Sequence, residues 1–451
     1  MIIVFIAFLF EFLLCNIIIA PNNGVEHNMA AWLLLEINII FVFLAICKSV
    51  KNKENFEEER SVKKMILSSF FIRIAVMFWD VYARNIFILP NSEGDAEWYY
   101  IDAIKYAFGS RADKVDTGRY AYYVGQLYKV IGVQKITVQF LHIFFAICSI
   151  VLIYKMLLMF KVDSRIRKAA MAIVCFLPNL MMITTFFLQE SVISFLIILS
   201  FYLYSKWWFS DKFSYIVLSV IASLSASVLH IGGIVVAVGV ISLAFIVSWK
   251  EHRLKLSPLR IIFMIALMFV VILILSQFGD TFTRKLGGGL SAESITHERD
   301  VRESGGSGYV IGISGLPASL DLIINTPIRM MYFIFSPLPW TWRGLSDLIA
   351  FFGSAIFYIY TVVLVVRVIR TKPIKRLQDD NITSYFFVLL VIILIASIMF
   401  GWGVANAGSA LRHREKFTYL FIVLFAISKE IILRTERLNG SKNSISDSSR
   451  L

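Results

Sequence analysis

The chain has 451 residues, of which 58% are hydrophobic and only 17% are charged. A soluble protein carries about 25% charged residues, so this composition excludes an ordinary water-soluble domain. The formal net charge of +13 is more typical of basic loops retained on the cytoplasmic side of a membrane than of nucleic-acid binding, and we expect no nucleic-acid partner.

Apolar runs long enough to cross a bilayer recur along the whole chain. They predict an all-α polytopic membrane protein with about twelve transmembrane helices. The expected spans are residues 2–20, 29–47, 65–83, 136–160, 169–187, 189–208, 213–230, 231–249, 260–278, 345–366, 384–403 and 417–433. Residues 1–434 would form one integral-membrane domain, and the polar tail at 435–451 is predicted to be disordered.

Basic residues orient the predicted spans. Lys and Arg crowd four connecting loops, at 48–64, 161–168, 250–260 and 367–376. Alternating spans place all four loops on one side, which the positive-inside rule assigns to the cytoplasm together with both termini. Three segments then face outward, at about 84–135, 279–344 and 404–416, and large loops on one side are where function is expected.

Part of the second outer segment is apolar enough to resemble a further span. This stretch reads "GLPASLDLIINTPIRMMYFIFSPLPW". A full crossing would move the basic loop at 367–376 to the outer side, so we expect an interfacial or re-entrant element.

The first outer segment contains the acidic, aromatic stretch "NSEGDAEWYYIDAIKYAF". A helix beginning near Glu97 would lie in the interface, with four apolar side chains on one face, namely Trp98, Ile101, Ile104 and Phe108. Asp95, at the start of this helix, is a candidate general base for a hydroxyl group. Alternatively, Asp95 together with Ser92 only caps the helix.

Four segments, in this order, resemble the polyprenyl-phosphate-dependent membrane glycosyltransferases of the GT-C superfamily. They are "GDAEWYYIDAIKYAF", "GRYAYYVGQLYKVIG", "CFLPNLMMITTFFLQESVISFLIILSFYLYSKWW" and "RHREKFTYLFIVLFAI". The pattern is also similar to the repeat-unit polymerases of capsule and O-antigen assembly. The resemblance implies GT-C-like outer loops with juxtamembrane helices, and an acidic catalytic residue, Asp95 or Glu97, followed by Tyr99. The chain lacks a clear DXD or WWDXG signature, which argues against oligosaccharyltransferase-like chemistry.

The third outer segment carries basic residues on the side where the orientation rule expects few. Arg412, Arg414 and Lys416 surround His413. With a lipid-linked donor implied by the resemblance, these four residues are predicted to hold its phosphate, because the guanidinium fork matches phosphate oxygens. The alternative is a surface cluster that binds anionic lipid headgroups.

Five other residues are candidate substrate contacts, and one of them is Tyr99, which follows the two acids. Glu190 begins a predicted span and would form an acidic pocket with Asp95, or else be an ordinary residue at a helix start. Arg329 and Arg343 flank "SPLPWTW", where Trp340 offers a face for stacking on a sugar ring. Anchoring in the interface is the alternative role for that segment.

These observations predict an inverting glycosyltransferase of the cytoplasmic membrane, with its active site on the outer face, in cell-surface polysaccharide assembly. The expected partners are a polyprenyl-linked sugar donor, a glycan acceptor, membrane lipids and other assembly proteins. No cofactor or metal site is predicted, although a divalent ion at Asp95 and Glu190 remains open. Two alternatives also remain open, namely a repeat-unit polymerase and, in another class, a flippase or transporter of lipid-linked oligosaccharides.

Overall fold

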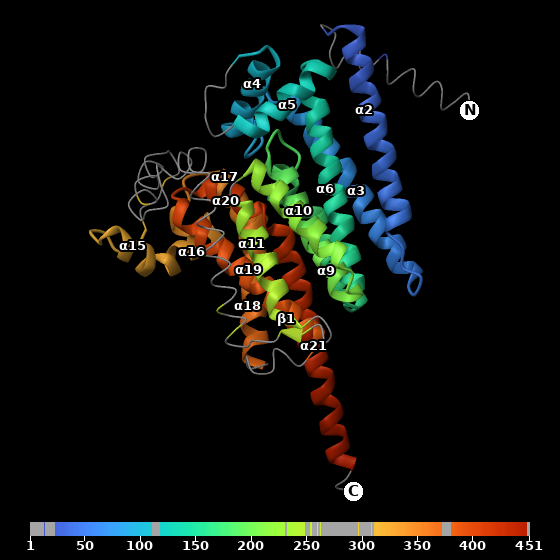
Figure 1. The fold of residues 1–451 in the computed structure, drawn as a ribbon, viewed down its shortest axis with the longest axis vertical. Coiled ribbons are helices and arrows are strands. Elements are labelled where there is room, and N and C mark those ends of the chain that lie inside the picture. The colour runs from blue at the N-terminus through green and yellow to red at the C-terminus, as the bar shows by residue number, and fades with distance from the viewer. Residues whose placement is uncertain are drawn as a thin grey trace. The chain divides into compact units, whose positions relative to one another are not determined.

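The chain folds almost entirely as helices (Figure 1). The computed structural model describes residues 23–110, 118–230, 232–248, 311–371 and 380–448, together with residues 13, 253, 254, 259, 262, 296 and 308. The predicted spans 2–20 and 260–278, and the predicted outer segment between 279 and 310, lie outside the described residues apart from the single residues 13, 262, 296 and 308. The chain divides into two compact units.

Unit 1 comprises Met1–Val151 and Pro178–Phe195. Its described elements are α2 (Val25–Leu44), the π-helical turn η2 (Ala45–Ser49), α3 (Phe56–Tyr82), α4 (Asp95–Ala107), α5 (Gly118–Ile131), most of α6 (Lys135–Met159), α8 (Pro178–Ile183) and the first turns of α9 (Glu190–Ser210). Three of its helices, α2, α3 and α6, are long and apolar, whereas α4 and α5 are short and amphipathic.

Polar side chains fix the two ends of α3. At its start, the Asn55 side chain accepts a hydrogen bond from the Glu58 amide at 2.9 Å, and three acidic residues in the first turn suit the helix dipole. At its other end, the buried Asp80 pairs with Lys135 at 3.1 Å and accepts a hydrogen bond from Gln139 at 2.6 Å. These contacts join the end of α3 to the beginning of α6.

Helices α4 and α5 pack closely against each other. A Cβ atom at Gly125 would lie 2.5 Å from the Tyr106 Cβ and 2.9 Å from the Ala103 carbonyl oxygen, so only glycine allows this approach. The predicted apolar face of α4 is on another side of the helix, where Trp98 and Phe108 stay 37% and 77% exposed. An amphipathic helix with an open apolar face is what an interfacial position requires.

Unit 2 comprises Leu152–Leu177 and Leu196–Leu451. Besides the ends of α6 and α9, its described elements are α7 (Ser164–Phe176), α10 (Phe213–Leu229), α11 (Gly233–Ile246), the short strands β1 (Val247–Ser248) and β2 (Arg253–Leu254), α15 (Ala318–Ile324), α16 (Thr326–Phe335), η4 (Pro339–Thr341), α17 (Leu345–Ala350), η5 (Phe351–Ala355), α18 (Ile356–Thr371), α19 (Asn381–Gly403), α20 (Ala407–Glu415) and α21 (Thr418–Ser448).

Helices α18 and α21 run parallel and set the long direction of this unit (Figure 1). Three hydrogen-bonded pairs follow both in the same order, namely Ser354 with Arg414, Tyr358 with Thr418, and Arg367 with Glu436. Helix α19 also packs against α21 and runs in the opposite direction, because Phe400 near its end packs on Phe417 at the start of α21 with ring centroids 5.4 Å apart. Unit 2 therefore has an α20 end and, opposite to it, a basic end that carries Arg367 and Arg437.

Parts of two predicted basic loops meet at the basic end. Asp163 caps α7 and pairs with Arg437 at 3.1 Å, while Arg367 pairs with Glu436 at 2.7 Å. Residues 161–168 and the described residues 367–371 therefore share one end of the unit, as the orientation argument requires.

Six described helices are long and apolar enough to cross a membrane, and α10 is a shorter apolar helix. The predicted count of twelve is not confirmed. The expected span at 169–187 is interrupted, because α7 ends at Phe176 and α8 holds only Pro178–Ile183. Proline at 178 disfavours helical geometry at Leu177 and removes a backbone donor.

The apolar stretch before residue 340 does not form one long helix. It is divided into α15 and α16, which meet at Asn325. The ten residues of α16 span about 15 Å, half of a hydrocarbon core, so this helix is too short to cross. At the far end of the chain, α21 continues to Ser448, into the tail whose composition predicts disorder.

Candidate functional site

The candidate base Asp95 is the first residue of α4. The cap before it is Gly94, with a φ of 66° and no side-chain hydrogen bond to the helix. Ser92 is buried, and its backbone amide bonds to the Leu89 carbonyl group. Neither Ser92 nor Asp95 therefore acts as the N-cap, and the half-buried Asp95 carboxylate lies in the first turn, where the helix dipole favours negative charge.

Glu97, the other candidate, is held by an arginine. Its carboxylate lies 2.6 Å from the Arg84 guanidinium, which also donates a hydrogen bond to the Ser92 carbonyl oxygen at 3.2 Å. This pair connects the segment after α3 to the first turn of α4. Glu97 consequently helps to position α4, and Asp95 remains the other candidate carboxylate in its first turn.

Aromatic side chains of α4 pack against aromatic side chains of neighbouring segments, and we call the group the aromatic layer. It consists of Tyr99, Tyr100, Tyr120, Tyr128 and Phe187, whose rings meet mostly edge to face at centroid distances of 5.2 to 6.5 Å. Tyr99, one helical turn after Asp95, contacts Tyr120 directly at 5.2 Å. Such contacts hold neighbouring rings in fixed orientations.

Tyr120 is the first member of a buried chain of hydrogen bonds. The Tyr120 hydroxyl lies 2.6 Å from the His142 Nε2, and the His142 Nδ1 lies 2.7 Å from the Phe186 carbonyl oxygen. A carbonyl oxygen only accepts, so Nδ1 carries the proton and the neutral ring accepts at Nε2 from Tyr120. Ser191 donates to the His142 carbonyl oxygen at 2.8 Å, which ties the beginning of α9 to the same chain.

Glu190 faces this chain. It is the first residue of α9 and is 2% exposed. Burial raises the pKa of Tyr120 well above its ordinary value near 10, and the charges of Tyr99 and Glu190 raise that pKa further. Tyr120 therefore stays protonated and keeps its donor role toward His142.

The structure also shows three buried polar residues in unit 1 that the sequence patterns did not single out as candidates. Tyr120 and His142 form the buried pair, and Asp102 is a completely buried carboxylate on α4, seven residues after Asp95. An ionisable residue within an apolar span is a recognised signal of function, and His142 in "VQFLHIFF" carries that signal. Tyr120 and Asp102 lack such a local signal, because aromatic and acidic residues surround them in the sequence.

In unit 2, Arg414 lies at the α20 end and is completely buried. Its guanidinium donates to the carbonyl oxygens of Ile334 and Ser336 at 2.5 and 2.9 Å and to the Ser354 hydroxyl at 2.9 Å. It also lies over the Tyr358 ring, 4.4 Å from the centroid. These contacts connect α16, η5 and α20, so the structure gives Arg414 a structural role.

The neighbouring basic residues form a second group. The Lys416 ammonium group lies 2.6 Å from the His413 Nδ1 and 5.8 Å from the centroid of the Phe400 ring. His413 contacts Phe400 and His230 at centroid distances of 5.2 and 5.1 Å. Lys416 is buried, whereas Arg412 and His413 are half-buried.

Arg329 and Arg343 occupy different surroundings. Arg329 is 2% exposed and pairs with Asp321 at 2.8 Å, and Asn325 donates to the same Asp321 oxygen at 2.8 Å. These bonds tie α15 to α16, which is a structural role. Arg343 is exposed, and its backbone amide donates to the Asp347 carboxylate at 2.9 Å.

A small cavity of about 270 Å³ surrounds Arg343. It is lined by Gly308, Trp340, Thr341, Trp342, Arg343, Asp347 and Ala407, and we call it the tryptophan cavity. Trp340 is 67% exposed, and its indole nitrogen donates to the Tyr332 hydroxyl at 2.8 Å. The cavity combines two indole rings with one cation and one carboxylate, which is a chemistry suited to a sugar.

Within the residues that the structure describes, His, Cys, Asp and Glu side chains form no group of three that would hold a metal ion. Nothing matches this chain among models of known protein families, curated proteins or solved structures. The geometry of the two units is therefore the basis for a functional proposal.

Proposed function

We propose that the protein is a membrane glycosyltransferase that moves a sugar or oligosaccharide from a polyprenyl-phosphate or -diphosphate donor to an acceptor hydroxyl group. One observation carries the proposal. The half-buried Asp95 carboxylate lies one turn before Tyr99, which contacts the buried, hydrogen-bonded pair of Tyr120 and His142, and the buried Glu190 is close enough for its charge to raise the pKa of Tyr120. Buried ionisable groups with fixed hydrogen bonds are costly for packing alone and cluster at functional sites.

In this proposal Asp95 accepts the proton of the acceptor hydroxyl group as that oxygen attacks the anomeric carbon. The glycosidic bond to the donor phosphate breaks in the same step, the phosphate leaves with the electron pair, and the anomeric configuration is inverted. Glu97 and Arg84 hold the first turn of α4, and the aromatic layer supports its position. Such fixed positioning is what keeps a base within reach of its substrate.

The tryptophan cavity is the proposed binding place for a sugar ring. Its volume of about 270 Å³ lies just below that of typical drug-sized sites, which suits one sugar residue. The exposed indole of Trp340 would stack on the apolar face of the ring, while Arg343 and Asp347 would bond to its hydroxyl groups. In unit 2, Arg412, with His413, is the proposed contact for the donor phosphate, since both are half-buried whereas the buried Arg414 guanidinium bonds to Ile334, Ser336 and Ser354.

The distribution of basic residues in unit 2 indicates which of its ends would face the cytoplasm. In unit 2, parts of the basic loops at 161–168 and 367–376 share one end, and α20 is at the other. The positive-inside rule would place the basic end in the cytoplasm and α20 outside. Nucleotide sugars are scarce outside the cytoplasm, so an outer site calls for a lipid-linked donor.

The decisive variant is Asp95→Asn. In host cells that lack the wild-type gene, this variant should accumulate the lipid-linked saccharide and make little surface polysaccharide. In isolated membranes the transfer rate should fall about 100-fold or more, because general-base catalysis contributes at least that factor. Glu93→Gln is the matched control, since Glu93 is an exposed carboxylate two residues earlier and its variant should retain wild-type transfer.

Two measurements separate the proposal from its alternatives. Accumulated saccharide that periodate oxidises from outside intact spheroplasts supports a transferase, whereas saccharide accessible only after lysis indicates a flippase. A ladder of products on a gel identifies a repeat-unit polymerase. Normal polysaccharide and unchanged transfer by Asp95→Asn at wild-type protein levels would remove Asp95 from the mechanism.

A further inference from the structure

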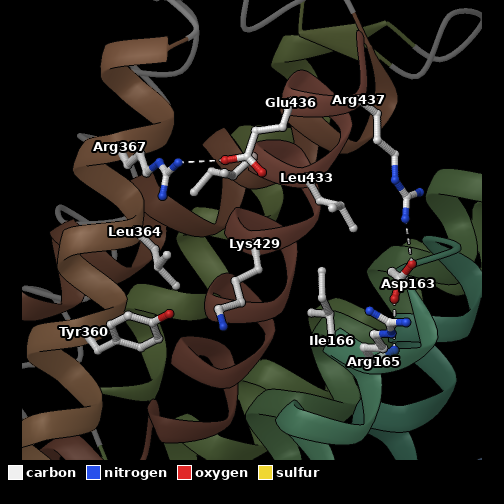
Figure 2. A pocket seen from close by; sticks show the side chains of 11 residues that line it. Asp163, Arg165, Ile166, Tyr360, Leu364, Arg367, Lys429, Leu433, Glu436 and Arg437 are labelled. Carbon is white, nitrogen blue, oxygen red and sulfur yellow. Dashed lines mark hydrogen bonds and ion pairs between the residues drawn. The ribbon is translucent and has the colours of Figure 1, made fainter. Parts of the chain in front are cut away.

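A larger cavity of about 550 Å³ lies at the basic end of unit 2 (Figure 2). It is lined by Asp163, Arg165, Ile166, Tyr360, Leu364, Arg367, Lys429, Ile432, Leu433, Glu436 and Arg437. Figure 2 shows that α18 forms one wall and the beginning of α7 the opposite wall, with α21 between them. We call it the basic cavity.

The basic cavity extends along α21 away from the α20 end. Of its lining residues, Lys429 follows Thr418 by about 16 Å along the helix, and Glu436 marks the far rim. Thr418, at the start of α21, bonds to Tyr358, and Glu436 on the same helix bonds to Arg367. The rise of 1.5 Å per residue separates Thr418 from Glu436 by about 27 Å, close to the thickness of a hydrocarbon core. The ionic rim of the cavity, at Arg367 and Glu436, would therefore lie near the membrane surface opposite to the α20 end of unit 2.

The cavity has more positive than negative charge. Its two carboxylates already have partners, since Glu436 pairs with Arg367 at 2.7 Å and Asp163 with Arg437 at 3.1 Å. The hydrogen bond from the Arg165 amide, with a smaller contribution from Arg437, holds the pKa of Asp163 below its ordinary value. Asp163 thus stays ionised across the neutral range.

Two further cations of the cavity, Lys429 and Arg165, form no ion pair with a described residue, although the Arg165 charge also helps to lower the pKa of Asp163. The Lys429 ammonium group faces the rings of Tyr360 and Phe425, 5.2 and 5.4 Å from their centroids. Among the residues that the structure describes, no carboxylate lies within ion-pair distance of Lys429 or of the Arg165 guanidinium. An anion that enters the cavity would meet both charges.

The walls are also apolar. Ile166, Leu364, Ile432 and Leu433 line the cavity beside its charged groups. On α18, aliphatic side chains next to the cavity remain exposed, with Val363 at 56% and Val366 at 40%. An open aliphatic helix face leading away from a cationic pocket fits an amphipathic ligand better than a small soluble anion.

We propose that the basic cavity binds the headgroup of an anionic phospholipid, with the phosphodiester between Lys429 and Arg165 and the acyl chains along the exposed face of α18. The volume of about 550 Å³ accommodates a phosphate with its glycerol. A lipid in this position would connect α7, α18 and α21 and stabilise the bundle. The inference does not depend on the chemistry proposed for Asp95.

The experiment uses the full chain in neutral detergent and measures bound lipid by native mass spectrometry. Phosphatidylglycerol should bind in a one-to-one complex about 10-fold more tightly than phosphatidylcholine. Lys429→Gln should weaken phosphatidylglycerol binding about fivefold, as expected for the loss of one cation near an anionic headgroup. Arg165→Gln should weaken it to a similar extent, and thus provides a second test if the first variant folds poorly.

Lys206→Gln is the matched control. Lys206 is half-buried like Lys429, and its ammonium group also faces two rings, those of Tyr202 and Tyr215, at 5.4 and 5.2 Å. It lies outside the basic cavity, so its variant should bind phosphatidylglycerol as the wild type does. Equal binding of the two lipids, or unchanged binding in both Lys429→Gln and Arg165→Gln, would overturn the proposal. Complete displacement of the lipid by millimolar glycerol 3-phosphate would overturn it in favour of a soluble phosphate ligand.

Discussion

The Tyr120 hydroxyl and the His142 imidazole share a hydrogen bond of 2.6 Å in the buried part of unit 1. The bond joins α5, which packs against α4, to α6, a helix long and apolar enough to cross a membrane. It therefore connects the support of Asp95 with the scaffold of the unit. Because His142 also donates to the Phe186 carbonyl oxygen, its orientation is fixed from both sides.

We predict that Tyr120→Phe destabilises the protein by about 1–3 kcal/mol, because it leaves the buried Nε2 of His142 without a donor. The loss should appear as a lower midpoint of thermal unfolding in detergent. Tyr122→Phe is the control, since Tyr122 is on the same helix and 46% exposed, and it should be nearly neutral. In a double-mutant cycle, Tyr120→Phe should cost less when His142 is already Leu. Additive effects in that cycle would show that the pair contributes no coupling.

Arg414 and Arg412, two residues apart on α20, are predicted to respond differently to substitution by Lys. Arg414→Lys retains the charge but loses the planar fork that bonds to Ile334, Ser336 and Ser354. We expect a loss of about 3 kcal/mol in the free energy of unfolding. Arg412→Lys, at a half-buried position, should cost less than about 1 kcal/mol.

Transfer activity should also distinguish Arg412 from Arg414. Arg412→Gln should reduce transfer in isolated membranes while the thermal midpoint stays near that of the wild type, as the proposed phosphate contact requires. Arg414→Lys that is as stable as the wild type would contradict the structural role assigned to Arg414. Full transfer activity in Arg412→Gln would show that Arg412 does not bind the donor phosphate.

The sequence predicts the helical membrane class well, because long apolar runs have few other solutions. The sequence is a less reliable guide to the number of transmembrane helices. The run that contains Pro178 is apolar throughout, yet the chain breaks there, and α11 has only 14 residues. Hydropathy averages over such interruptions, so the predicted span at 169–187 was expected as one helix.

For the candidate site, the local sequence pattern identified the acidic residues Asp95 and Glu97, but it could not predict which residues they contact in the fold. The start of α4 at Asp95 follows from the acidic first turn, whereas the pairing of Glu97 with Arg84 depends on how the chain returns after α3. The basic cluster around His413 is visible in the sequence, but the burial of Arg414 is not. Its partners are about 60 to 80 residues away along the chain, and such contacts leave no periodic signal.

Glu415 provides a prediction about pH. It is completely buried in α20, and the Thr418 hydroxyl donates to its carboxylate at 2.7 Å. Burial raises the pKa of Glu415 from its ordinary 4.5 to about 7, although the neighbouring Arg414 and the hydrogen bond from Thr418 oppose that rise. The folded protein therefore holds a proton on Glu415 more tightly than the unfolded chain does.

The consequence is a loss of stability as the pH rises. The stabilising contribution of protonated Glu415 is complete below pH 4.5, decreases as the pH rises through about 7, and is absent above that value. Glu415→Gln keeps a neutral group at this position, so between pH 5 and pH 8 the variant should gain stability relative to the wild type, on the order of 3 kcal/mol. Thermal midpoints of both proteins in detergent across this range measure the difference, and Glu93→Gln, at an exposed position, should follow the wild type. A constant difference between Glu415→Gln and the wild type from pH 5 to pH 8 would mean that Glu415 titrates as it does in the unfolded chain.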